Sequence, residues 1–172
     1  MEIPYSPEQT RSTLQALPDG VAGTRETLRL MVEMARKGKR TLAVRRLAQQ
    51  ILVDVPQKAW IAEVRSIQAY VRDHVRYTMD IRDIETLQTP EKTIEFNQGD
   101  CDDKSILVAS LLESVNHPAR FIAVGQEPNA YEHVYVETRI ANHWIPVETT
   151  EPVGLGWQPD PNRYRYRLVY NV

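Results

Sequence analysis

The pattern of apolar residues changes once along this chain, and that change limits the fold more than any other feature. Before Pro118 the apolar residues recur every three or four positions, which predicts helices over 24–37, 41–56, 57–77 and 100–115. After Pro118 apolar and polar residues alternate, which predicts strands over 119–124, 131–139, 143–148 and 164–170. Helices that precede strands are typical of an α+β domain with an antiparallel sheet.

The length of 172 residues is typical of one compact domain with a single hydrophobic core. Prolines and glycines predict that residues 1–23 form an irregular N-terminal arm. We expect residues 24–56 to form a helical hairpin that packs on a core of residues 57–172. The periodicity is lost over 78–99, which predicts a long loop with a short helical turn, and loops of about 20 residues are often functional.

The composition excludes several classes of protein. The chain has 21 basic and 23 acidic residues, a net charge of −2, so no overall charge attracts it to nucleic acid or anionic lipid. The single cysteine, Cys101, excludes an internal disulfide framework and a Cys-rich zinc site. The sequence shows neither a signal-peptide pattern nor a run of ~18 apolar residues that would span a membrane. We therefore expect a cytoplasmic location.

The segment around Cys101 is the part of the sequence that most indicates chemistry. Gly99 permits a tight turn, Asp100 can cap the following helix, and Cys101 then lies in the first helical turn. The free N–H groups there favour a thiolate and can also bind an oxyanion. Asp102 and Asp103 oppose a thiolate unless their carboxylates point away. The alternative is that Cys101 is a small buried apolar residue.

A base for the cysteine is available on the predicted strands. His133 lies in one strand and Glu148 at the end of the next. If these strands form a hairpin with Thr138 opposite His143, then His133 lies opposite Glu148 on the same face. A nucleophilic cysteine needs a base, and the base needs a group that orients it, so Cys101, His133 and Glu148 are a candidate triad.

Several blocks, taken in this order, resemble the transglutaminase-like superfamily. They are Gly99-Asp100-Cys101-Asp102-Asp103, Pro118-Ala119-Arg120-Phe121, His133-Val134-Tyr135-Val136-Glu137 and Trp144-Ile145-Pro146-Val147-Glu148. The resemblance covers about residues 57–160, and Gly156-Trp157-Gln158-Pro159 is similar to the small versions encoded in tailed bacteriophages and prophages. It implies a papain-like core in which the cysteine-bearing helix packs on an antiparallel sheet.

The resemblance also implies a role for each site residue. Cys101 is the nucleophile, His133 is the base and acid, and Glu148 stands where the family usually has aspartate. Gln88 resembles the glutamine of a Gln-x-Pro motif in bacterial transglutaminase-like cysteine proteases. Its amide is a candidate second oxyanion donor beside the Cys101 N–H, and the alternative is an ordinary loop glutamine.

The glutamate at position 148 departs from the family pattern. It is one methylene longer than aspartate, so the strand or the imidazole must sit slightly differently for the carboxylate to reach the ring. Glu151 or Glu132 could take the third position instead, although Glu132 faces away from His133 on a regular strand.

Neither a metal nor a cofactor is predicted. Asp100, Asp102 and Asp103 resemble the start of a calcium loop, but Ser105 stands where that loop needs glycine. The histidines lack the spacing of a metal-binding helix. Residues 25–46 carry eight basic side chains without a recognition motif, so a solvated or partner-facing helix is favoured over a nucleic-acid site.

These features together predict a cysteine-dependent amide hydrolase or acyltransferase that works through a thioester acyl-enzyme. A peptidase that acts on a peptide or protein amide is favoured over a cross-linking transglutaminase. The alternative is a catalytically silent phage assembly module that keeps the fold to bind phage structural proteins, located in the host cytoplasm or the virion.

Overall fold

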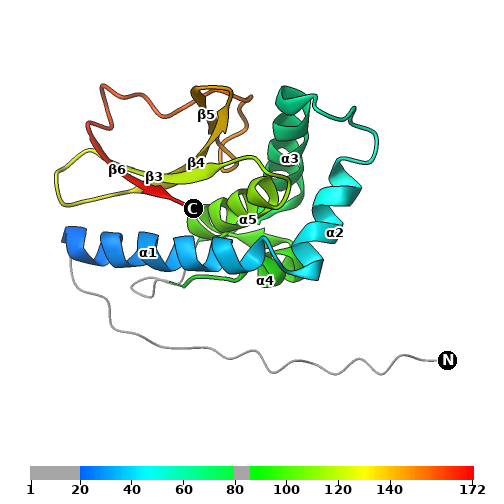
Figure 1. Cartoon of the computed structure of the whole chain (residues 1–172). Coiled ribbons are helices and arrows are strands. Elements are labelled where there is room, and N and C mark those ends of the chain that lie inside the picture. Colours follow the sequence, from blue (N-terminus) through cyan, green and yellow to red (C-terminus); the bar gives the residue numbers. More distant parts are fainter. Residues whose placement is uncertain (1–19, 80–85) are drawn as a thin grey trace, which may run out of the picture.

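The structure is a computed structural model that describes residues 20–79 and 86–172 (Figure 1). The helices described are α1 (Gly20–Gly38), α2 (Leu42–Ile51), α3 (Trp60–His74), α4 (Pro90–Phe96) and α5 (Cys101–Ser114). The strands described are β1 (Arg76–Tyr77), β2 (Gln98–Gly99), β3 (Ala119–Gly125), β4 (His133–Ile140), β5 (His143–Val147) and β6 (Tyr166–Asn171).

The main sheet is antiparallel, with the strand order β5-β4-β3-β6. The short strands β1 and β2 pair in parallel with each other, apart from the main sheet. Helix α5 lies between the main sheet and α1, as Figure 1 shows. The predicted α+β class with an antiparallel sheet is therefore confirmed.

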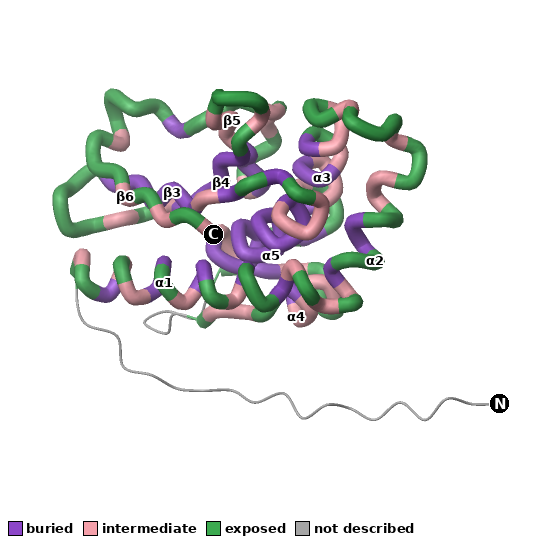
Figure 2. The backbone as a smooth tube through the Cα atoms, viewed as in Figure 1, coloured by how far each residue is buried: buried purple, intermediate pink, exposed green. Residues whose placement is uncertain are grey.

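Helix α5 forms the centre of the core. Every residue from Asp102 to Leu112 is buried, and Figure 2 shows this helix as a nearly continuous buried segment. Its sequence lacks a polar face because α1, α2, α3, α4 and the sheet all pack against it. Cys101 therefore lies at the start of a helix that is buried along most of its length.

Several predicted helix boundaries are wrong. Helix α2 ends at Ile51 rather than at residue 56, and α3 begins at Trp60 rather than at residue 57. Helix α1 begins at Gly20, so residues 20–23 do not belong to the predicted arm, and the rest of that arm lies outside the described residues. The glycine at 23 does not break the helix because it is buried on the packed face. Helix α3 ends at His74 because Arg76–Tyr77 pairs with Gln98–Gly99, and the Arg76 N–H donates to Asn97 O at 2.9 Å.

The predicted hairpin register is wrong by two residues. His143 lies opposite Ile140 rather than Thr138, because only Ala141 and Asn142 connect the strands. Ala141 adopts the left-handed backbone (φ 52°) that a tight two-residue connection requires. Side chains alternate with a period of two along a strand, so this shift leaves each residue on its predicted face.

The long segment between α3 and α5 contains more regular structure than expected. The predicted helical turn is α4, where Pro90 occupies the first turn and the Thr89 hydroxyl caps the Lys92 N–H at 3.4 Å. Residues 80–85 lie outside the described part.

No helix in the described ranges is long and apolar enough to cross a membrane.

We expect the substitution Gly125→Ala at the end of β3 to lower the free energy of unfolding by more than about 2 kcal/mol. A Cβ added there would lie 2.0 Å from Ala130 O, which is backbone and cannot move aside cheaply. Gly154→Ala is the matched control, because nothing lies within 4 Å of a Cβ added at Gly154. Urea denaturation of both variants checks the prediction, and equal stabilities would contradict it.

Candidate active site

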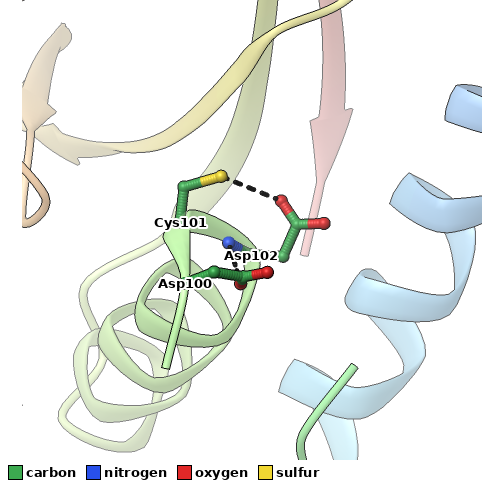
Figure 3. A group of neighbouring side chains, drawn as sticks. All are labelled: Asp100, Cys101 and Asp102. Carbon is green, nitrogen blue, oxygen red and sulfur yellow. Dashed lines mark hydrogen bonds between the residues drawn. The ribbon is translucent and has the colours of Figure 1, made fainter. Parts of the chain in front are cut away.

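The helix that carries Cys101 begins with a capping box. The Asp100 carboxylate accepts hydrogen bonds from the N–H groups of Asp102 (2.9 Å) and Asp103 (3.1 Å). The Asp103 carboxylate accepts in return from the Asp100 N–H at 3.4 Å. The cap does not use the N–H of Cys101, which occupies the first helical position (Figure 3).

The glycine before the cap is a steric requirement of this turn. A Cβ added at Gly99 would lie 2.5 Å from Asp103 Cβ and 2.9 Å from an Asp103 carboxylate oxygen. The turn that presents Cys101 therefore brings the backbone of Gly99 against the side chain that closes the capping box.

Gln88 contacts the capping box rather than the cysteine. Its backbone N–H and its side-chain Nε2 each donate to the Asp103 carboxylate at 2.7 Å, and Nε2 also approaches Gln98 O at 3.5 Å. These contacts turn the Asp103 carboxylate toward Gln88, so Asp103 is occupied by the loop rather than by the cysteine. Since both amide hydrogens of Gln88 have acceptors here, its oxyanion role stays a prediction.

The structure brings His133 and Glu148 together. His133 is the first residue of β4, Glu148 directly follows β5, and His133 Nε2 lies 2.7 Å from Glu148 Oε2. The other carboxylate oxygen, Oε1, accepts from the N–H groups of Thr150 (2.6 Å) and Glu151 (3.4 Å). The two alternative carboxylates do not replace Glu148, because Glu132 accepts instead from Gln126 at 2.8 Å and Glu151 contributes its backbone.

Glu148 is fully buried (0% exposed) and yet favours its charged form. Burial alone would raise its pKa, but the hydrogen bond and the charge of His133 and the two backbone N–H groups outweigh burial and lower it. When His133 is neutral, the ionised Glu148 accepts the proton on Nε2, and Nδ1 is then the ring nitrogen that can accept a proton.

Cys101 lies beside the residue that follows His133. The Val134 backbone N–H interacts with the Cys101 sulfur, and the Ser105 hydroxyl, one helical turn further on, donates to Val134 O at 3.3 Å. Helix α5 is therefore held against the first residues of β4, the strand on which His133 lies.

The Cys101 thiol is not a preformed thiolate in this structure. Burial is the main cause that raises its pKa, and the charges of Asp102 and Asp100 raise it further, while the Val134 N–H opposes them. Figure 3 shows the Asp102 carboxylate turned toward the Cys101 sulfur, at 3.5 Å. The helix N-terminus favours a thiolate as predicted, but burial and the two carboxylates outweigh that effect.

A cavity of about 580 Å³ opens beside His133. Exposed aromatic side chains form part of its wall, with Tyr77 45% and Trp157 42% exposed. Tyr164 and the charged residues Glu132, Glu151, Asp160 and Arg163 complete most of the rest. The histidine side of the site is thus open to a ligand of peptide size.

The residues Asp100, Cys101 and Asp102 offer three potential metal ligands within 4.8 Å of one another. Asp100 already uses one carboxylate oxygen to accept two helix N–H groups. The sequence predicts no metal here, and an acidic turn of this kind is common at helix N-termini.

Two further polar side chains near the site were not predicted. Gln68 and Lys104 are 1% and 2% exposed, and each hydrogen-bonds to backbone carbonyls around the site. The sequence does give one indication of them. Each is a polar residue at a helix position where the apolar pattern predicts a buried side chain.

A cysteine helix packed on an antiparallel sheet, with a histidine and a carboxylate at the ends of adjacent strands, is the arrangement of papain-like cysteine hydrolases. The chain belongs to the transglutaminase-like superfamily, whose sequence profile matches residues 45–149. No significant match was found among curated protein sequences.

Solved structures share the fold. The match to a proposed cysteine protease from Cytophaga hutchinsonii has a TM-score of 0.52 at 20% identity and covers 74% of this chain and 45% of that protein. The LapG protein of Legionella pneumophila gives 0.54 at 13% identity, with 83% and 85% covered. A Rad4/XPC nucleotide excision repair complex gives 0.53 at 14% identity, with 86% and 46% covered. The chain thus spans less than half of the Cytophaga protein, and likeness at these identities shows the fold alone.

We expect Glu148 to make the free energy of unfolding fall as the pH is lowered. Its pKa is lower in the folded protein than in the unfolded chain, so its contribution is present above about pH 4.5 and is lost as the pH falls through the folded value. The free energy of unfolding should therefore fall more between neutral and acid pH in the wild type than in Glu148→Gln. Denaturation at several pH values measures this difference, and parallel curves would contradict it.

We expect Asp102→Asn to make Cys101 more reactive, because it removes a negative charge 3.5 Å from the sulfur and so lowers the pKa of the thiol. The rate of iodoacetamide alkylation near pH 8 should rise severalfold. Asp54→Asn, on the exposed loop after α2, is the control and should leave the rate unchanged. An unchanged rate in Asp102→Asn would show that its charge does not hold the thiol protonated.

Proposed function

We propose that this protein is a cysteine peptidase that cleaves an amide through a Cys101–His133–Glu148 triad. The observation that carries this proposal is the 2.7 Å contact between His133 Nε2 and the buried Glu148 carboxylate, beside a helix that begins with Cys101. Membership of the transglutaminase-like superfamily and the shared fold of proposed cysteine proteases support it.

The chemistry uses a neutral Cys–His pair. Because the pKa of Cys101 is raised, the thiol gives its proton to His133 Nδ1 as the sulfur attacks the substrate carbonyl carbon. The negative oxygen of the tetrahedral intermediate accepts a hydrogen bond from the Cys101 N–H. The Asp100 carboxylate does not compete for this N–H, because it accepts from the N–H groups of Asp102 and Asp103. Glu148 stabilises the imidazolium that forms.

Two further steps complete the turnover. The C–N bond breaks, the leaving amine takes the proton from His133, and a thioester joins the acyl group to Cys101. His133 then removes a proton from water as that water attacks the thioester, which releases an acid and restores the thiol. An amine in place of water would give a new amide, so the acceptor distinguishes a peptidase from an acyltransferase.

The cavity beside His133 is the proposed substrate site. Trp157 and Tyr77 present exposed aromatic surface there, which suits an extended peptide whose side chains contact the wall. The wall also carries the charged residues Glu132, Glu151, Asp160 and Arg163, whose side chains can hydrogen-bond to the polar backbone of such a peptide.

A second candidate is a catalytically silent binding module. The raised pKa of Cys101 favours it, and so does the fold shared with the Rad4/XPC complex, which takes part in DNA duplex opening. The resemblance to small phage-encoded versions would make structural proteins of a phage the partners of this module.

We expect the wild-type protein to cleave an unfolded protein mixture such as casein, and Cys101→Ala and His133→Ala to lose this activity by about 10³-fold or more. Peptides made in isotopically labelled water carry the label at their new carboxyl ends if water is the acceptor. Added methylamine gives methylamide ends if the enzyme transfers acyl groups. Mass spectrometry of the products measures both outcomes.

A catalytically silent module gives a different result. No Cys101-dependent cleavage and no acyl adduct at Cys101 with chloromethyl ketone peptides would reject the peptidase and leave the binding module. Glu148→Gln, which keeps the shape of the side chain, should retain the fold and lose most of the cleavage.

A further inference from the structure

Two buried polar side chains lie next to the site without touching its reacting atoms. Gln68 in α3 and Lys104 in α5 are both almost fully buried. A buried polar group is costly unless it makes hydrogen bonds, and both groups make them. What they bind therefore indicates why they are there.

Gln68 holds the backbone of Glu148. Its Nε2 donates to Glu148 O at 2.9 Å, across 80 residues of sequence. One helical turn further along α3, Arg72 Nη1 donates to Val153 O at 2.9 Å. The segment that follows β5 is thus fixed at two points to a single face of α3.

Lys104 holds α5 against the C-terminal end of α3. Its Nζ donates to Val75 O at 2.8 Å and approaches Arg72 O at 3.4 Å. These carbonyls lie at the C-terminal end of α3, where they lack partners within the helix and the helix dipole favours a positive charge. Lys104 lies only three positions after Cys101, so this contact fixes the first turn of the cysteine helix.

We propose that Gln68 and Lys104 are positioning residues that use α3 to set the place of Cys101 relative to the His133–Glu148 pair. Lys104 ties the first turn of α5 to α3, and Gln68 ties Glu148 to the same helix. For catalysis, this inference rests on the proposed peptidase function. The hydrogen bond between His133 and Glu148, however, can be observed without any substrate.

The charges around Lys104 agree with this role. Burial lowers its pKa to about 8, while attraction to Glu148 and Asp73 opposes burial and Arg72 adds to it. Lys104 is therefore mostly a cation at neutral pH, and its charge favours the ionised form of Glu148.

The test for Gln68 is the variant Gln68→Met, which keeps the length of the side chain and removes the amide. The proton on His133 Nε2 should give a downfield NMR signal in the wild type, because Glu148 protects it from exchange. We expect Gln68→Met to broaden or abolish this signal while far-UV circular dichroism stays unchanged. Gln68→Asn, whose amide is too short to reach Glu148 O, should do the same if Gln68→Met does not fold.

Ile67→Val is the matched control. Ile67 is the buried neighbour of Gln68 in α3 and makes no hydrogen bond to the segment after β5, so this variant loosens the core alone. It should keep the His133 signal. A signal retained in both Gln68 variants would overturn the role of Gln68, and loss of the signal in Ile67→Val as well would reduce that role to general stability.

The test for Lys104 is Lys104→Met, and its readout is the cysteine. The part of Cys101 alkylation by iodoacetamide that His133→Ala removes should fall on the order of tenfold, because a misplaced nucleophile reacts slowly. The His133 signal should remain. An unchanged His133-dependent rate in Lys104→Met would overturn the role of Lys104.

Failure of the peptidase proposal looks different. In that case the wild type itself shows no His133-dependent alkylation and no cleavage, and the NMR test still decides whether Gln68 positions Glu148. If Gln68→Met also kept the His133 signal, the positioning proposal would fail in its own right.

Discussion

A carboxylate without solvent contact must find all its partners inside the protein, and Glu148 is such a carboxylate. One oxygen meets His133, and the other accepts two backbone N–H groups of the segment after β5. The buried charge is tolerated because three elements contact this residue. The β4–β5 hairpin brings His133 to the carboxylate, the turn after β5 supplies the two N–H groups, and Gln68 of α3 holds the Glu148 backbone. The orientation of the imidazole follows from these contacts.

The cysteine side of the site is built differently, from one helix start and the loop before it. Gly99, Asp100 and Asp103 close the turn on themselves, and Gln88 draws the Asp103 carboxylate away from the sulfur. Asp102 remains close to the sulfur and, together with burial, keeps the thiol protonated. The raised pKa keeps Cys101 in the thiol form, and a thiol is oxidised less readily than a thiolate.

The sequence predicts the fold well where the apolar pattern is strong. The buried helix α5 and the four strands of the main sheet lie close to their predicted ranges, because each has a clear period. The start of α1 is not predicted, because glycines such as Gly20 and Gly23 usually indicate a loop. Only the packing in the structure shows that Gly23 is buried within the helix. The contacts of Gln88, Gln68 and Lys104 join segments 15 to 80 residues apart, and no local pattern encodes such partners.

The hairpin between β4 and β5 also has a consequence for evolution. Its register differs from the simplest expectation by two residues, and yet His133 and Glu148 meet. An insertion or deletion of one residue in either strand would turn one partner to the opposite side of the sheet. A change of two residues within one strand would keep both partners on the same side of the sheet, so the contact depends on the parity of the spacing between histidine and carboxylate more than on its value.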